Sequence, residues 1–130
     1  MRMMALALVL AASTAQAKPP LEEVKSVTDG LLWVGIADEI RNVCPSISAR
    51  MVKALGYINS IQADAKARGY TKAEIDAFRT SEANKAELRR RGEAYLKSHG
   101  VDFDDPESYC VLGRAEIKKS SQIGALLKAK

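Results

Sequence analysis

The sequence is poor in the residues from which most catalytic and metal sites are built. Its 130 residues include one histidine, His99, and two cysteines, Cys44 and Cys110. One imidazole and two widely spaced thiols cannot enclose a zinc ion, and the chain has neither a Gly-x-Ser-x-Gly nor a Ser-x-x-Lys motif. His99 precedes Gly100 at the end of an expected helix, where a partly charged imidazole complements the helix dipole. We therefore predict no catalytic residues, no metal site and no cofactor.

Few aromatic residues are available to line a sugar-binding cleft, since the chain has one tryptophan, four tyrosines and two phenylalanines. Hydrolysis of a glycosidic bond also needs two carboxyl groups on opposite sides of that bond. Asp38 and Glu39 are adjacent in an expected helix, so their side chains point in different directions. A cell-wall hydrolase that works through Asp or Glu is therefore the functional hypothesis that the sequence supports least.

No apolar run reaches the roughly 18 residues that a membrane-spanning helix needs. The run at 5–12 follows Arg2 and precedes Ala15, Gln16 and Ala17, which form the small-x-small pattern that a signal peptidase cleaves. No cysteine follows Ala17 directly, so the pattern is not that of a lipoprotein. We predict a signal peptide at 1–17, removed after Ala17, and a periplasmic protein formed by 18–130. A buried N-terminal helix is the alternative.

The two cysteines favour a disulfide, because disulfides persist in the compartments to which exported proteins are delivered. A bridge between Cys44 and Cys110 closes a loop of about 67 residues, for which the chain-entropy model gives about 4 kcal/mol of stabilisation. Free thiols for metal or redox chemistry are the alternative. That alternative lacks a Cys-x-x-Cys spacing and a nearby histidine.

Apolar residues recur at helical spacing along 18–130, and no segment has a convincing strand pattern. The first expected helix begins at Pro20 or Ser26 and ends at Pro45, and the second begins at Ser46 or Ser48 and ends at Gly69. A short third helix begins at the capping box of Thr71 and Glu74. The fourth extends from Ser81 to Gly100, and the fifth begins at Asp105 and Pro106 and continues past Ile117. A last short turn or helix is expected from Ser121 to about Leu127. Because the connections are short, we predict an all-α fold: a compact single-domain bundle of about five helices with antiparallel neighbours, stapled by one disulfide.

Two further features of the helices predict how they pack. Met51, Leu55, Ile58 and Ala65 should form the buried face of the second helix. Glycines at 35, 56, 92, 113 and 124 lie inside expected helices, where each costs about 1 kcal/mol relative to alanine. We interpret these glycines as points of close packing between helices, with a functional hinge as the alternative.

One dense basic cluster, in the fourth expected helix, comprises Lys85, Arg89, Arg90 and Arg91. In an exported chain such a cluster does not indicate nucleic acid as the partner. Glutamates at 82, 87 and 93 lie within one turn of these cations, so a solvated, charge-paired helix face is one interpretation. The other is a surface that attracts anionic lipid, a wall polymer or an acidic partner.

An acidic cluster before the fifth expected helix comprises Asp102, Asp104, Asp105 and Glu107. Its start resembles a calcium-binding loop, but Glu107 replaces the glycine of the sixth position and Gly113 replaces the glutamate of the twelfth. Capping of the helix and complementation of its dipole explain these residues better. The cluster is also a second candidate interaction surface.

Several short motifs resemble an uncharacterised family of small exported alphaproteobacterial proteins, domain of unknown function 5333. They are Lys18-Pro19-Pro20-Leu21, Asp29-Gly30-Leu31, Ala37-Asp38-Glu39-Ile40, Ile47-Ser48-Ala49-Arg50, Gly69-Tyr70, Ala73-Glu74-Ile75-Asp76-Ala77, Ser108-Tyr109-Cys110, Gly113-Arg114-Ala115-Glu116-Ile117 and Ser121-Gln122-Ile123-Gly124. The resemblance covers nearly all of 18–130. It implies export and one helical domain, and it implies no activity.

Three functional hypotheses follow from these observations. The first is a non-enzymatic periplasmic protein that binds an envelope protein or polymer, through the basic cluster or the acidic cluster. The second is a periplasmic stress chaperone of the small, helical, single-disulfide type, an analogy of size and disulfide only. The third is the carboxylate-dependent hydrolase. The identity of the partner and the oligomeric state stay open.

Overall fold

The computed structural model describes residues 18–130, and the predicted signal peptide lies outside the described residues. Within that range the chain forms six α-helices, one short 3-10 helix and two short strands. In chain order they are η1 (Leu21–Glu23), α1 (Lys25–Val43), β1 (Ile47–Ala49), α2 (Met51–Ala67), α3 (Lys72–Thr80), α4 (Glu82–Ser98), α5 (Pro106–Lys118), α6 (Gln122–Ala125) and β2 (Leu127–Ala129). No helix in 18–130 combines the length and the apolar character needed to cross a membrane. The predicted all-α fold class is confirmed.

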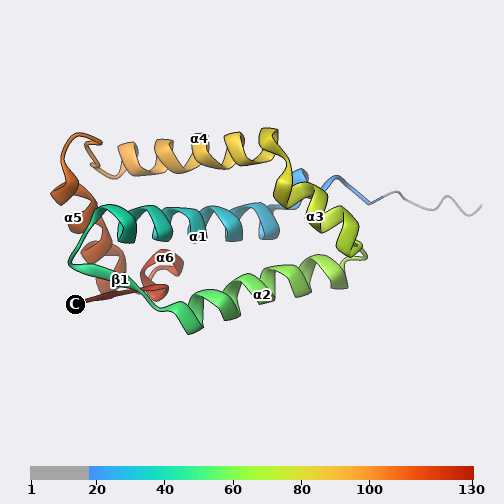
Figure 1. Ribbon diagram of the computed structural model, residues 1–130, viewed down its shortest axis with the longest axis horizontal. Coiled ribbons are helices and arrows are strands. Elements are labelled where there is room, and N and C mark those ends of the chain that lie inside the picture. The colour runs from blue at the N-terminus through green and yellow to red at the C-terminus, as the bar shows by residue number, and fades with distance from the viewer. Residues whose placement is uncertain (1–17) are drawn as a thin grey trace, which may run out of the picture.

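Helix α1 lies in the middle of the molecule, with α4 along one side and α2 along the other (Figure 1). Helix α3 crosses one end of this layer, whereas α5, α6 and the strands close the opposite end. Helix α2 is antiparallel to α1, as we expected, but α4 runs in the same direction as α1. The expectation of antiparallel neighbours is wrong for α4 because α3 carries the chain across the end of the layer before α4 begins.

Local capping signals set most helix boundaries. The Thr71 hydroxyl accepts a hydrogen bond from the backbone N–H of Glu74 at 3.1 Å, and the Glu74 carboxylate accepts one from the N–H of Thr71 at 3.2 Å. Ser81 and Asp105 cap α4 and α5 in the same way, by accepting from backbone N–H groups. Helix α4 ends just before Gly100, whose φ of +86° is a conformation that glycine adopts without strain. These predicted boundaries are confirmed.

The start of α2 differs from the expectation because the preceding residues form a strand. Residues of β1 pair with β2 in antiparallel register, with Ile47 opposite Ala129. Helix α2 therefore begins at Met51, and neither Ser46 nor Ser48 caps it. The partner of β1 lies about 80 residues away in the sequence, so no local pattern could reveal this pairing.

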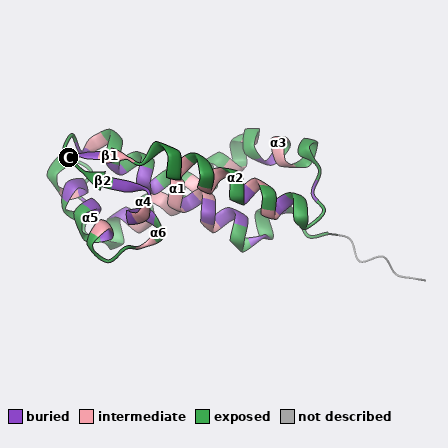
Figure 2. Ribbon diagram, turned by 90° about the horizontal axis from the view of Figure 1, so that it is seen from below, coloured by how far each residue is buried: buried purple, intermediate pink, exposed green. Residues whose placement is uncertain are grey.

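The buried core has two parts. One surrounds the disulfide at the end that holds the strands, where Cys44 and Cys110 have Cα atoms 5.2 Å apart and are 0% and 2% exposed. The other lies toward α3 and includes Val27, Ile61 and Phe78. Figure 2 shows buried residues along α1 and at the strand end, whereas α3 is mostly exposed. The predicted disulfide is confirmed.

Glycines inside the helices differ in how closely they are packed, and at Gly92 an added Cβ would be in ordinary contact, 3.8 Å from Ile36. An added Cβ at Gly113 would lie 2.8 Å from Ile40, and one at Gly124 would overlap the backbone of Glu116. At Gly35 and at Gly56 an added Cβ would meet no atom within 4 Å. Close packing therefore explains Gly113 and Gly124, as predicted, and that interpretation is wrong for Gly35 and Gly56.

Candidate functional site

The N-terminal half of α2 exposes apolar side chains. Met51 is 55% exposed and Leu55 is 56% exposed, so the expectation that they are buried is wrong. Further along the helix Ile61 and Ala65 are buried, because they pack beside Val27 and Phe78 in the core. The same helix thus anchors its C-terminal half and leaves its N-terminal half uncovered.

These exposed side chains form one wall of a hollow of about 330 Å³. Leu31, Val34 and Gly35 of α1 form its floor, and Leu88 of α4 lies on the far side. Every residue of α2 that lines the hollow is apolar: Met51, Ala54, Leu55 and Ile58. The hollow can therefore receive an apolar group between α2 and α4.

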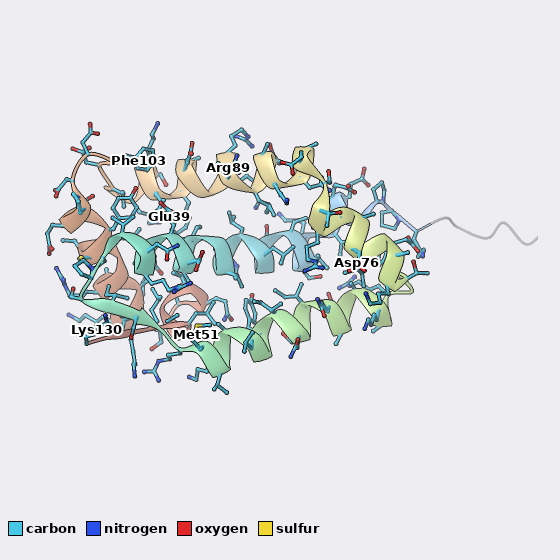
Figure 3. All side chains as sticks on the ribbon, in the orientation of Figure 1. Glu39, Met51, Asp76, Arg89, Phe103 and Lys130 are labelled. Atoms are coloured by element: carbon cyan, nitrogen blue, oxygen red, sulfur yellow. A yellow bond between two sulfur atoms is a disulfide. The ribbon has the colours of Figure 1, made fainter. Side chains whose placement is uncertain are left out.

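A second hollow of about 440 Å³ lies between α1 and α4 and ends at Phe103. It shares Leu31, Gly35, Lys85 and Leu88 with the first hollow, so the two hollows adjoin along α1. We call the combined depression the trough. In Figure 3 the labelled Met51 and Arg89 lie on opposite sides of α1, and they mark the two walls of the trough.

Charges are unevenly distributed around the trough. Lys85 and Arg89 lie one helical turn apart on the α4 wall. The Lys85 ammonium is 3.3 Å from the carboxylate of Glu82, and no carboxylate among 18–130 forms an ion pair with Arg89. Glu93 lies one turn beyond Arg89 on the same wall, so the α4 wall is basic only around Lys85 and Arg89, whereas the α2 wall is apolar.

The structure divides the predicted basic cluster between three environments. Only Lys85 and Arg89 line the trough. The Arg90 guanidinium instead lies 2.7 Å from the Glu87 carboxylate on the solvent side of α4. Arg91 donates a hydrogen bond of 2.7 Å to Asp29 and so ties α4 to α1.

The predicted acidic cluster is largely used by local structure. The Asp102 carboxylate accepts a hydrogen bond of 2.9 Å from the N–H of Asp104. Asp105 caps α5, and Glu107 forms an ion pair of 2.7 Å with Arg114. Among 18–130 no three histidine, cysteine, aspartate or glutamate side chains are grouped so that they could hold a metal ion.

Glu116 is the buried carboxylate of the described chain, 1% exposed, and it lies outside the trough. It accepts hydrogen bonds from the hydroxyls of Tyr95 in α4, at 2.7 Å, and of Ser121, the N-cap of α6. The Lys119 ammonium lies 3.2 Å away. Burial raises the pKa of Glu116, but these partners outweigh burial and hold the pKa below its usual value.

The pKa of Tyr95 is shifted in the opposite direction, upward. Burial raises its pKa, and the hydrogen bond to Glu116 together with the charge of that carboxylate raises it further. Its ring stacks on His99 with centroids 3.8 Å apart and meets Trp33 edge-on at 5.7 Å. The group of Tyr95 and Glu116 therefore joins α1, α4, α5 and α6, which is a structural role.

The trough itself was missed at the sequence level, although one signal pointed to it. Leu31, Val34 and Gly35 form a second stripe on α1, next to the buried stripe of Leu32 and Ile36. A helix with two adjacent apolar stripes needs cover on more than one side. Only the rotation of each helix in the fold shows that this second stripe is left partly exposed.

Comparison with known proteins gives a family and no described activity. No curated protein and no solved structure matches the chain. Residues 19–128 match a family of unknown function (DUF5333). The match covers most of the chain and nearly all of its described part, so the chain belongs to this family.

Proposed function

We propose that this protein is an exported, non-enzymatic binding protein of the cell envelope that holds its partner in the trough. The trough itself carries this proposal, because two adjoining hollows that expose Met51, Leu55 and Phe103 leave apolar surface in water, as interaction sites do. The leader pattern at 1–17 and the buried disulfide support export to an oxidising compartment.

The directions of the carboxyl pKa shifts favour a binding protein over a hydrolase. A general acid needs a carboxyl group whose pKa is raised toward neutrality. The clearly shifted carboxyl groups have lowered pKa values instead: Asp64, Glu74, Asp76, Glu87 and Glu116. The trough offers shape, apolar surface and cations, which suit binding.

Site-specific crosslinking in the envelope tests the proposal. A photoreactive amino acid in place of Leu88 lies inside the trough, and one in place of Val111 lies on an exposed position of α5 outside it. We expect position 88 to give one discrete adduct and position 111 to give none. The recovered protein should begin at Lys18. Equal labelling from both positions, or no adduct from position 88, contradicts the proposal.

Two glycines provide a matched pair of blocking variants. Gly35→Trp should fill the trough, whereas Gly56→Trp adds the same side chain to another open helical glycine that does not line it. An added Cβ meets no atom within 4 Å at either position, and far-ultraviolet circular dichroism checks that both variants fold. We expect G35W to abolish the adduct at position 88 and G56W to leave it unchanged. The same loss in both variants would mean that the trough is not the binding surface.

A second candidate function is a chaperone that opens in acid, and the lowered carboxyl pKa values favour it. Hydrogen bonds from Ser26, Lys18, Lys72 and Arg90 are the largest causes of lowering for Asp64, Glu74, Asp76 and Glu87, respectively. A lowered folded-state pKa stabilises the fold above the unfolded-state pKa, and this contribution is lost as the pH falls through the folded-state pKa.

The fluorescence of an apolar dye tests the chaperone hypothesis. We expect it to stay constant from neutral pH to about pH 5 and to rise below about pH 4, as these carboxylates are protonated and apolar surface becomes exposed. Far-ultraviolet circular dichroism should show that helices persist under these conditions. Fluorescence that stays flat down to strongly acidic pH would remove the chaperone as a candidate.

A further inference from the structure

We infer that the occupant of the trough is an amphipathic α-helix of another envelope protein, with carboxylates on the flank that faces α4. This inference rests on the proposed function and names the chemistry of the partner. A helix lying over α1 between α2 and α4 would cover the partly exposed stripe of Leu31, Val34 and Gly35. It would form a second layer on the layer of α2, α1 and α4.

Gly35 supports a helix as the occupant. It lies in the interior of α1, where glycine is less favourable than alanine, and nothing in the described chain packs where its Cβ would be. Gly113, in contrast, has a neighbour in the fold that needs the space. A glycine in the floor lets the backbone of a crossing helix approach α1 closely, at the short end of the usual distances between helix axes.

The walls define which sides of the incoming helix are apolar and which are acidic. Toward α2 it meets only apolar side chains, with Met51 and Leu55 more than half exposed. Toward α4 it meets Lys85 and Arg89, spaced one turn apart. Carboxylates separated by one turn on a partner helix would match this spacing and give Arg89 the ion pair that no residue in 18–130 supplies.

The acidic stretch of the partner must be short. Glu93 follows Arg89 by one turn on α4, and Glu39 of α1 lines the same hollow near Phe103. Asp38, at the edge of the first hollow, is already held by Arg41 at 2.7 Å. A helix with carboxylates along its whole length would place some of them against Glu39 and Glu93, so the carboxylates belong on the part that faces Lys85 and Arg89.

Binding of two designed peptides tests this inference. Both have about 18 residues, enough for roughly five helical turns, and share one apolar face of leucine and alanine. One carries two glutamates a turn apart on one flank, and the other carries lysines at the same positions. Fluorescence anisotropy with the disulfide-bonded protein should show at least about tenfold tighter binding of the glutamate peptide. The glutamate peptide should also compete with the crosslink at position 88.

Charge reversal at neighbouring positions provides the control. Arg89→Glu should invert the preference between the peptides, and Arg90→Glu should leave it within about twofold, because Arg90 pairs with Glu87 outside the trough. Equal binding of both peptides, or the same effect of both variants, would overturn the inference.

Other occupants would also overturn the inference. The trough would be assigned to lipid if vesicles of anionic phospholipid bound in a Gly35→Trp-sensitive way and the peptides did not. A concentration-dependent dimer that G35W abolishes would assign it to a second copy of the chain. If neither peptide binds but the crosslink from position 88 persists, the proposed function survives and only the acidic helix is excluded.

Discussion

Replacing Cys44 and Cys110 together by alanine should lower the free energy of unfolding by about 4 kcal/mol. The bridge joins the residue after α1 to the second turn of α5, across a sequence separation of 66 residues, so its loss releases a large part of the unfolded chain. Both cysteines are buried beside Ile40 and Ile47. Urea denaturation followed by circular dichroism measures the change.

The neighbouring Val111→Ala variant is the control for this experiment. Val111 is 57% exposed, so its truncation should change stability by less than about 0.5 kcal/mol. Reduction of the native protein should reproduce most of the loss found in the double variant. A loss below about 1 kcal/mol in both cases would mean that the packing around Ile40 and Ile47 holds this end of the molecule without the bridge.

Glu116→Ala should cost about 3 kcal/mol, since it leaves the partly buried hydroxyls of Tyr95 and Ser121 without their charged acceptor. Glu116→Gln should cost less, because the amide oxygen can still accept one of these hydrogen bonds. The exposed Glu107→Ala, on the same helix, should cost less than about 0.5 kcal/mol. Thermal and urea denaturation distinguish these three outcomes.

The pH dependence of stability gives a second measurement on Glu116. Because the folded-state pKa of Glu116 is lowered, its stabilising contribution is complete above about pH 5 and is lost as the pH falls through the folded-state value. The difference in stability between the native protein and Glu116→Gln should therefore shrink below about pH 4. A difference that stays constant in acid would mean that folding does not shift the pKa of Glu116, and a difference that grows would mean that folding raises this pKa.

The parts of the fold that could be predicted from the sequence depend on short-range chemistry. A capping box such as that of Thr71 and Glu74 joins groups three residues apart, and an aspartate before a proline, as at Asp105, defines a helix start by itself. The β1–β2 pair and the direction of α4 depend on where distant segments meet. Apolar periodicity says that a face needs cover, and it does not say which segment covers it.

The candidate site shows the same limit at the level of single side chains. Arg89, Arg90 and Arg91 are consecutive and chemically identical, yet one lines the trough, one pairs with a solvent-exposed glutamate and one ties α4 to Asp29. Successive residues point about 100° apart around a helix, so the rotation of α4 against α1 determines the role of each arginine. Met51 and Leu55 illustrate the same limit. Their apolar side chains predict burial, but the fold places no segment over them.

The strand pair has a consequence for the order in which the molecule can be completed. Leu126 and Leu127 belong to the core around the disulfide, and Leu127 aligns with Ala49 across the two strands. During synthesis from the N-terminus these residues are added after all the helices of 18–130, so the core around the disulfide cannot be completed before then. The same dependence makes the 126–129 segment a poor place to attach a rigid fusion.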